Sequence, residues 1–514
     1  MNRMFVTLCL VASLVWASAH AEDDRLATLK ELKIDSGTIN SVKRDDSPAL
    51  TASDGKVLRN NIPPRTIIKA LLNPAPGSNI RIEICLPDAG KWNGRFLGLG
   101  NGGAAGSISS NNLAGWMAGG FAVATTDMGT APAPNSGVGN REVWKDFGFR
   151  STHLMTVVAK QFVTAFYGKA PEYSYFSGGS TGGQQALQEA QRYPEDYDGI
   201  AAAVPAHCRT PLHAYFLWND QILKKCPFNK TQEDAVIAAG IEYMAARETP
   251  AAAGKFVSDP RCNAKDIEAV VALALKKDAT LTQEHAEALR KLFDGPHHAV
   301  TGERIFNGIP FGSSIQSSHG HLYLFNWVFG AEKKTDDINF GADIDTYTAA
   351  LGPWLNAENP DLSAFAKRGG KIILSSGTAD SIVPYHATLD YYERVIEQCG
   401  GLEKAQSFAR LYIIPGMAHG GGGPGINQSP NLLDAVKDWR EKGTAPNALP
   451  GKRVVNAGSG TAGKTEIEMP IYPYPTKTVW DAATSSYKPQ APAPPVEGPR
   501  GGVERVAARF LPHR

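Results

Sequence analysis

A pentapeptide in the first half of the chain has the pattern of a serine nucleophile. Gly178-Gly179-Ser180-Thr181-Gly182 matches G-x-S-x-G, in which a serine hydroxyl stands exposed on a sharp turn between a strand and a helix. Glycines flank the serine because a side chain there would collide with the neighbouring strand or helix. The pattern alone also fits an ordinary Gly/Ser turn. An apolar strand is expected over 173–177 and a helix over 184–192, so the sequence favours Ser180 as a nucleophile.

Two later loops offer the groups that such a serine needs. A hydroxyl requires a base to accept its proton, and the base requires a third group to fix its tautomer. In hydrolases with this turn, the chain order is serine, acid, histidine. Asp380 follows an expected strand over 371–374, and His419 follows another over 410–414. We assign Asp380 as the acid and His419 as the base. Asp390 is the alternative acid, but it falls in a helical stretch, where we expect its side chain to face solvent.

A glycine-rich loop after an earlier strand has two interpretations. Gly98-x-Gly100-x-x-Gly103, taken with Asp127, resembles a dinucleotide-binding loop. The alternative is an oxyanion hole, in which the backbone N–H groups of Gly102 and Gly103 act together with that of Thr181. The residues after the loop form a poor helix start, which a dinucleotide site would need. The sequence therefore favours the oxyanion hole.

A second glycine motif is a literal match to a phosphate-binding loop. Residues 458–465 read G-x-x-x-x-G-K-T. A phosphate loop needs a helix directly after it, with its N-terminus aimed at the phosphates. Glu466-Ile467-Glu468-Met469-Pro470 and proline-rich sequence follow instead, so we predict no nucleotide site here.

The elements that must position these residues alternate between strand and helix up to about Val204. This alternation predicts an α/β-hydrolase fold with a mostly parallel sheet covered on both faces. The stretch from Val204 to Lys371 is too long for one crossover and contains helical stretches over 231–247, 264–277 and 281–293. The predicted organisation is a hydrolase core over 22–205 and 361–475, an inserted lid over 206–360, and a Pro-rich C-terminal extension over 476–514.

The N-terminus has the pattern of a secretory signal peptide. Arg3 precedes an apolar run from Met4 to Trp16, and small residues end at Ala19-His20-Ala21. The run is too short to span a bilayer, so we predict cleavage after Ala21 and a secreted or periplasmic protein without a membrane anchor. Five cysteines follow Ala21, and an odd number leaves at least one without an intramolecular disulfide.

Charge is balanced along the chain. It has 52 Lys and Arg against 51 Asp and Glu, without a basic block. This balance argues against nucleic acid or an anionic membrane as a partner.

Several motifs together resemble the tannase/feruloyl esterase family, whose members include mono(hydroxyethyl) terephthalate hydrolase. The resemblance runs in order from about residue 60 to 475. It implies an α/β-hydrolase core with a large inserted lid, and cleavage of esters of aromatic acids such as ferulate and gallate. The motifs that carry it are Trp92-Asn-Gly-Arg-Phe96, Gly100-Asn-Gly-Gly103, Asp146-Phe-Gly-Phe-Arg150 with His153, Ser180-Thr-Gly-Gly183, Tyr391-Tyr-Glu-Arg394 and Pro415-Gly-Met417.

The chain departs from the family pattern at a disulfide and a metal site. The family usually has cysteines just before the nucleophile and just before the histidine, where this chain has Gly179 and Ala418. The family's lid usually carries a calcium site that begins with a Cys-Asp pair. Gly240-Ile241 stand at that pair, and few acids follow. We therefore expect no metal and no other cofactor. At position 130 the chain has a threonine, where the family commonly has a histidine.

Together these features predict a serine carboxylic ester hydrolase that acts on a small aromatic ester through an acyl-enzyme. Phe325, Trp327 and Phe329 would stack on the acyl ring, or else form ordinary lid core. Two alternatives remain open. One is a non-catalytic binding protein on a hydrolase scaffold. The other is a serine hydrolase acting on a different ester, a lactone, a peptide or an aromatic polyester fragment.

Overall fold

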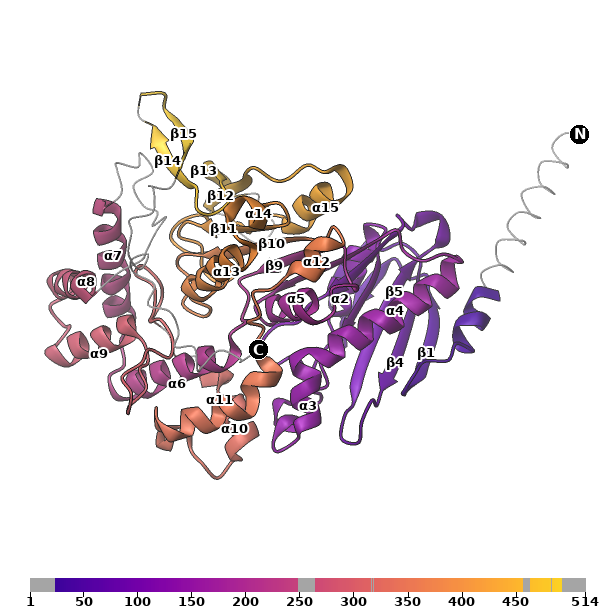
Figure 1. Cartoon of the computed structure of the whole chain (residues 1–514), viewed down its shortest axis with the longest axis horizontal. Helices are drawn as coiled ribbons and strands as arrows, with labels where there is room; N and C mark the ends of the chain where they lie inside the picture. Colours follow the sequence, from indigo (N-terminus) through magenta and orange to yellow (C-terminus); the bar gives the residue numbers. More distant parts are fainter. Residues whose placement is uncertain are drawn as a thin grey trace, which may run out of the picture.

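A nine-stranded sheet forms the centre of the molecule in the computed structural model (Figure 1). The structure describes residues 24–247, 264–315, 317, 319–455, 463–481 and 483–491. Neighbouring strands are antiparallel from β1 to β7 and parallel from β7 to β11. Across the sheet, the order is β1 (Gly37–Asp45), β4 (Arg65–Leu72), β5 (Ile80–Pro87), β7 (Ala122–Thr126), β6 (Arg95–Leu99), β8 (Tyr173–Gly179), β9 (Gly199–Ala203), β10 (Lys371–Gly377) and β11 (Ala409–Ile414).

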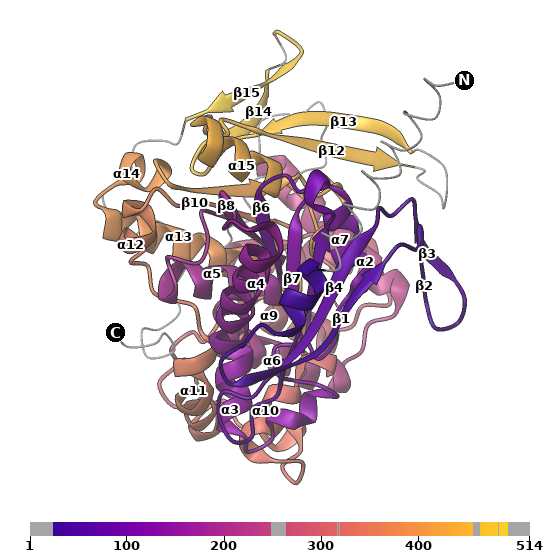
Figure 2. The same cartoon turned by 90° about the vertical axis from the view of Figure 1, so that its right-hand side faces the viewer.

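Helices cover both faces of the parallel strands. Adjacent apolar residues of one strand point to opposite faces, as strand geometry requires. Phe96 packs with α4 (Ser151–Tyr167), α5 (Thr181–Arg192) and α13 (Tyr385–Cys399), whereas Leu97 packs with α2 (Ser110–Ala118) and α15 (Leu432–Lys442). Figure 2 shows α15 and α4 on the two sides of the sheet. The predicted α/β-hydrolase fold is confirmed.

The segment between β9 and β10 is mainly helical. We call residues 206–360 the helical insertion. It has an apolar core of its own, and it also packs against Met128, Trp144 and Phe147 of the sheet domain. In Figure 1, its helices α7 to α9 lie at the end of the molecule opposite β1 and β4. Its longer helices are α6 (Arg209–Lys225), α7 (Lys230–Arg247), α8 (Ala264–Lys277), α9 (Gln283–Asp294), α10 (Tyr323–Phe329) and α11 (Ala342–Leu355).

Shorter elements complete the described chain. β12 and β13 form one hairpin, β14 and β15 a second, and β2 and β3 a third. The β14–β15 hairpin occupies part of the extension expected over 476–514, so that part is ordered into strands. These elements are β2 (Ala49–Thr51), β3 (Val57–Asn60), α3 (Arg141–Lys145), α12 (Ser363–Lys367), α14 (Leu402–Gln406), β12 (Leu449–Val455), β13 (Lys464–Ile471), β14 (Lys477–Asp481) and β15 (Ser486–Gln490).

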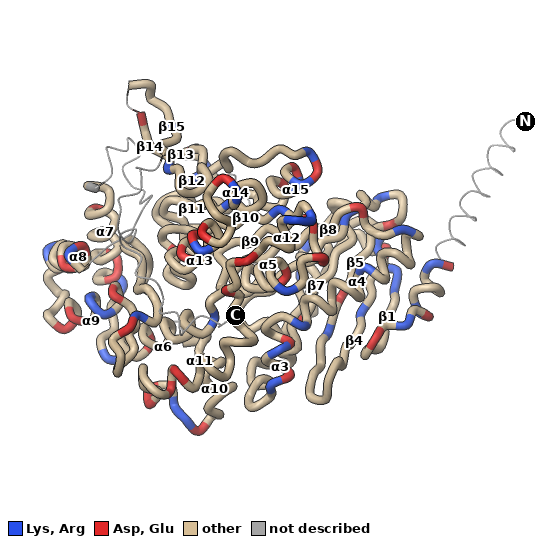
Figure 3. The backbone as a smooth tube through the Cα atoms, viewed as in Figure 1, with Lys and Arg blue, Asp and Glu red and all other residues tan. Residues whose placement is uncertain are grey.

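Basic and acidic residues are interspersed along the backbone (Figure 3). The predicted signal peptide lies outside the described residues. Within the described ranges, no helix combines the length and apolar character that crossing a membrane requires. A strand, β13, begins at Lys464 of the G-x-x-x-x-G-K-T match. The helix that a phosphate loop needs is therefore not there.

Candidate active site

Ser180 occupies a strained turn at the carboxyl end of β8. Its φ is 59° and its ψ is −117°, a conformation that residues other than glycine rarely adopt. The Ser180 N–H donates to the Ala203 carbonyl at 3.0 Å, and the Ser180 carbonyl accepts from Gly183 N at 2.9 Å. Helix α5 begins directly after the serine, at Thr181 rather than at the expected Gln184. These bonds fix the serine between a strand and a helix.

Glycines surround this turn because three backbone segments meet there. A Cβ on Gly178 would lie 2.5 Å from the Gly182 carbonyl oxygen. A Cβ on Gly100 would lie 2.5 Å from the Cα of Gly182. Both distances are too short for real contacts, so the steric reason expected for Gly178 is confirmed. A Cβ on Gly182 would be tight but not excluded, with its nearest neighbours at 3.1 Å. Gly179 differs, since its Cβ would have its nearest neighbour at 3.6 Å.

Asp380 and His419 form a hydrogen-bonded pair. His419 Nδ1 lies 2.8 Å from Asp380 Oδ2. Asp380 is fully buried, and its other oxygen accepts from the N–H groups of Ile382 and Val383, both at 2.9 Å. An ionised Asp380 accepts the Nδ1 proton and leaves Nε2 of His419 as the acceptor. The His419 side chain is 24% exposed, so the ring borders accessible space.

The sheet brings these residues to one edge. β8, β9, β10 and β11 are parallel neighbours, so the loops after them leave the same edge of the sheet. Ser180 follows β8, Asp380 follows β10 and His419 follows β11.

Asp390, the alternative acid, has different surroundings from those expected. It lies on α13 and is only 5% exposed, and its carboxylate accepts from Arg394 Nε at 3.1 Å. The expectation that its side chain faces solvent was wrong. Pairing with the Arg394 guanidinium offsets the cost of burying the carboxylate.

The glycine-rich loop presents unused backbone donors beside Ser180. Its position is fixed by bonds from Gly182 N to the Asn101 carbonyl at 2.8 Å and from Asn101 N to Gln185 Oε1 at 2.8 Å. Among the described residues, the N–H groups of Gly102, Gly103 and Thr181 donate to no other atom of the protein. These donors are therefore available to a bound molecule.

The same loop lacks the features of a dinucleotide site. The next helix, α2, begins only at Ser110, so no helix N-terminus follows Gly103 directly. Asp127 is engaged elsewhere, because its carboxylate accepts from Arg81 Nε at 2.7 Å. Both observations agree with the interpretation that the sequence favoured.

The insertion contributes a buried arginine that the sequence analysis missed. Arg209, the first residue of α6, donates from Nη1 to Thr181 Oγ1 at 3.1 Å. Its Nη2 donates to the Gly103 carbonyl at 3.1 Å and to the Tyr323 hydroxyl at 2.9 Å. Nothing in the local sequence marks Arg209, because an arginine at a helix start is usually exposed.

Two histidines of the insertion lie near this arginine. Burial, and then the Arg209 charge, hold the pKa of His213 well below its usual value. Burial also lowers the pKa of His321, with further contributions from Arg209 and His419. His321 of the insertion therefore lies near His419, and the lowered pKa values disfavour the charged form of both histidines.

The three aromatic residues proposed to contact substrate differ in how deeply they are buried. Phe325 and Trp327 are each 1% exposed. Phe325 stacks on Tyr347 with ring centroids 4.3 Å apart, and Trp327 Nε1 donates to the Pro134 carbonyl at 2.7 Å. These two side chains belong to the core of the insertion, which is the second of the two interpretations that the sequence left open. Phe329 is half-buried, with the Lys333 ammonium over its ring.

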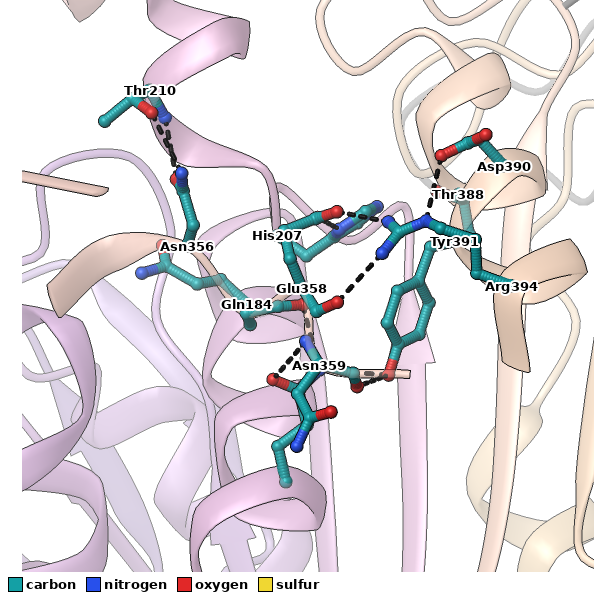
Figure 4. A network of polar contacts seen from close by, with 12 residues as sticks. Gln184, His207, Thr210, Asn356, Glu358, Asn359, Thr388, Asp390, Tyr391 and Arg394 are labelled. Atoms are coloured by element: carbon teal, nitrogen blue, oxygen red, sulfur yellow. Dashed lines mark hydrogen bonds and ion pairs between the residues drawn. The ribbon is translucent and has the colours of Figure 1, made fainter. Parts of the chain in front are cut away.

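A polar network fastens both ends of the insertion to the sheet domain (Figure 4). His207, where the insertion begins, bonds to Glu358, where it ends, and Glu358 also pairs with Arg394 of α13. Gln184 Nε2 of α5 donates to the Leu355 carbonyl at 2.9 Å. Helices α5 and α13 follow the Ser180 turn and the Asp380 loop, respectively. The network thus ties the insertion to the two helices behind these loops.

Where the family's calcium site begins, the described residues offer no side chain that could bind a metal ion. A Cβ on Gly240 would lie 2.5 Å from Gly312 N, so an acidic side chain has no room at this position. Ile241 presents an apolar side chain that lies against Gly312. Glu248, Asp259 and Cys262 lie outside the described residues.

Two overlapping segments that together span most of the chain match one protein-family model. Residues 67–337 and 323–491 match the model described as tannase and feruloyl esterase. The chain belongs to this family. The resemblance inferred from the sequence motifs is confirmed, and the protein is an esterase of the tannase and feruloyl esterase type.

Relatives of the tannase and feruloyl esterase family align along most of the chain. An uncharacterized esterase of Xanthomonas campestris pv. campestris is 30% identical, over 91% of this chain and 90% of the relative. Feruloyl esterase B of Aspergillus niger is 31% identical, over 74% of this chain and 78% of the relative.

Solved structures from the same family share the fold. Feruloyl esterase B from Aspergillus oryzae superposes with a TM-score of 0.76 at 23% identity, covering 91% of this chain and 100% of that chain. A tannin acyl hydrolase from Aspergillus niger gives a TM-score of 0.71 at 18% identity, covering 91% of this chain and 95% of that chain.

Proposed function

We propose that the protein is a serine carboxylic ester hydrolase that cleaves small esters of aromatic acids through an acyl-enzyme on Ser180. The observation that carries the proposal is the 2.8 Å bond between His419 and Asp380, at the same sheet edge as the strained Ser180. The names of the relatives, feruloyl esterase and tannin acyl hydrolase, support an aromatic acyl group.

In the first half of the reaction, Ser180 Oγ attacks the ester carbonyl while His419 Nε2 accepts its proton. Asp380 holds the imidazole in the required tautomer and stabilises its charged form. The oxygen of the tetrahedral intermediate accepts from Thr181 N–H and from Gly102 or Gly103 N–H. His419 then returns the proton to the leaving alcohol.

In the second half, water attacks the acyl-enzyme with His419 as the base, and the acid is released. Every step uses side chains and backbone groups of the chain itself, and the proposal includes no metal or cofactor. The helical insertion acts as a lid over the acyl group. The leader pattern ending at Ala21 supports export from the cytoplasm.

Replacement of the proposed nucleophile tests this function. Ser180→Ala should fold with an unchanged melting temperature and lose turnover of methyl ferulate, methyl gallate, a terephthalate monoester and p-nitrophenyl esters by a factor on the order of 10⁴ or more. An esterase-directed phosphonate should label the Ser180 peptide of the wild type and leave the variant unlabelled. Ser177→Ala, on the same strand, is the control and should keep its activity.

The same measurements also distinguish the proposed hydrolase from a non-catalytic binding protein. Activity of Ser180→Ala within tenfold of the wild type would contradict the proposal. A wild type that binds the esters, yet shows neither turnover nor phosphonate labelling, would indicate a binding protein instead.

A further inference from the structure

Arg209 is a buried cation without a carboxylate partner among the described residues. The residue is 3% exposed, and its guanidinium bonds to three neutral oxygens, those of Gly103, Thr181 and Tyr323. Its Nε has no hydrogen-bond partner. Burying a charge is costly unless an opposite charge lies nearby. Two other arginines follow that rule, since the buried Arg65 pairs with Asp45 and the half-buried Arg394 pairs with Glu358.

The three neutral oxygens place the guanidinium at the proposed oxyanion hole. Arg209 Nη1 bonds to the Thr181 hydroxyl, and Nη2 bonds to the Gly103 carbonyl, each at 3.1 Å. Thr181 Oγ1 in turn donates to the Gly103 carbonyl at 2.7 Å. These bonds close a ring that links the glycine-rich loop to the start of α5. The unused N–H groups of the oxyanion hole belong to the same two residues and to Gly102.

The groups around Arg209 include an aromatic ring, a tyrosine hydroxyl, two histidines and a helix N-terminus. The Phe147 ring lies 5.2 Å below the guanidinium, and the Tyr323 hydroxyl completes its contacts from α10. Burial, and then the charge of Arg209, lower the pKa values of His213 and His321 and so disfavour their charged forms. The N-terminus of α5, at Thr181, adds a partial positive charge.

We propose that Arg209 is the positioning residue of the oxyanion hole, which holds Gly103 and Thr181 in place and supplies the counter-charge for the anionic tetrahedral intermediate. The inference rests on the proposed function, because only the Ser180 reaction creates that anion. A neutral ester in the ground state gains little from the charge, whereas the transition state gains much. The helical insertion therefore takes part in catalysis through Arg209 and does more than cover the site.

The test compares ground-state and transition-state binding in Arg209→Met. This variant removes the charge and keeps most of the side-chain volume. We expect kcat to fall by roughly 10²–10³, the loss typical of removing one oxyanion donor, with KM changed less than threefold. An arylboronic acid probes the anion directly. Its boron accepts Ser180 Oγ, the serine proton passes to His419, and the adduct is a tetrahedral boronate anion. Its affinity should fall in parallel with kcat.

Ground-state binding is measured separately on a Ser180→Ala background. The affinity for methyl ferulate should be the same with and without Arg209→Met. A purely structural defect would weaken ester and boronate binding together, whereas loss of the counter-charge weakens only the boronate.

Arg192→Met is a control with the same kinds of contacts at an exposed position. Arg192 also lacks a carboxylate partner among the described residues, donates to Gln188 Oε1 at 2.6 Å and to the Pro353 carbonyl at 3.0 Å, and lies over the Phe149 ring at 4.6 Å. It is the last residue of α5, at the end of the helix away from Ser180. Its replacement should leave kcat and boronate affinity unchanged.

Arg209→Lys keeps the proposal testable if Arg209→Met does not fold. Lysine keeps the charge but cannot reach all three oxygens in the geometry of a guanidinium, so kcat should fall about tenfold, again in parallel with boronate affinity. A folded Arg209→Met variant with kcat within fivefold of the wild type, or a kcat loss in either variant with unchanged boronate affinity, would overturn the role of Arg209. Activity of Ser180→Ala would instead overturn the proposed function.

Discussion

The turn at Ser180 depends on glycines, because neighbouring backbone occupies the space that a side chain would need. Gly100, Gly178 and Gly182 come from three segments that approach so closely that a methyl group on Gly100 would meet Cα atoms of the other two at 2.5 and 3.0 Å. Backbone neighbours cannot move aside in the way that the end of a flexible side chain can. The strained serine and the unused N–H groups of the glycine-rich loop both rely on this close approach.

Gly100→Ala should therefore separate the glycine-rich loop from α5. We expect the free energy of unfolding to fall by about 1–3 kcal/mol, the usual cost of overpacking, and ester turnover to fall at least tenfold. Gly179→Ala is the control, because its Cβ would meet nothing closer than 3.6 Å, and its stability should stay within about 0.5 kcal/mol of the wild type. Urea unfolding measures both variants. Equal destabilisation of the two would contradict the packing argument.

At the scale of elements, the helical insertion contacts the sheet domain in two places near the loops of Ser180 and Asp380. The network of His207, Glu358 and Arg394 fastens its ends to α13 (Figure 4). Arg209, which also bonds to Tyr323, contacts the glycine-rich loop. The apolar core of the insertion also includes Ala104 and Ala105 of that loop and Val383 after Asp380. The insertion therefore touches the proposed oxyanion hole directly.

Helix α7 gives a prediction about calcium. Gly240 and Ile241 pack against Gly312 at the positions where the family's calcium site begins, and calcium asks for six to eight oxygen ligands, usually with several carboxylates. EDTA should therefore leave the melting temperature and the ester turnover unchanged. The assay compares enzyme treated with EDTA, enzyme treated with EDTA and then calcium, and untreated enzyme. A drop of several degrees that calcium reverses would show that other residues bind the ion.

At the scale of the whole molecule, one buried acid makes stability depend on pH. Glu189 of α5 is fully buried, and burial, followed by the negative charge of Asp196, raises its pKa well above the usual value. The folded state therefore binds a proton at Glu189 more tightly than the unfolded state. The stabilisation from this group is complete below the unfolded pKa of about 4.3 and is lost as the pH rises toward the folded pKa.

Glu189→Gln should remove this pH dependence. Glutamine has nearly the same shape and does not titrate, so the variant should gain stability relative to the wild type as the pH rises from 5 to 8. Urea unfolding at pH 5, 6.5 and 8 measures the difference. The neighbouring titratable groups, His153, Lys160 and Asp196, are present in both proteins. Parallel pH profiles would show that Glu189 does not titrate differently on folding.

The sequence by itself determined the fold class, the family and the positions of Ser180, Asp380 and His419 on loops after parallel strands. The fold class and the three positions rest on local signals: an apolar run, a glycine turn, and the order of three residue types along the chain. The family was inferred from a set of motifs that occur in order along the chain. The helices expected over 231–247, 264–277 and 281–293 likewise appear as α7, α8 and α9, because their apolar periodicity is a property of each segment alone.

Only the tertiary structure decided which side chains are buried and which of them meet. Arg209, Gly103, Thr181 and Tyr323 come from four separate segments, and no local pattern brings an arginine to a glycine-rich loop. Likewise, the helical stretch around Asp390 gave no sign that Arg394 would pair with it inside the molecule, since burial depends on what packs against a helix. Periodicity describes the faces of one element, whereas a site is made where the faces of several elements come together.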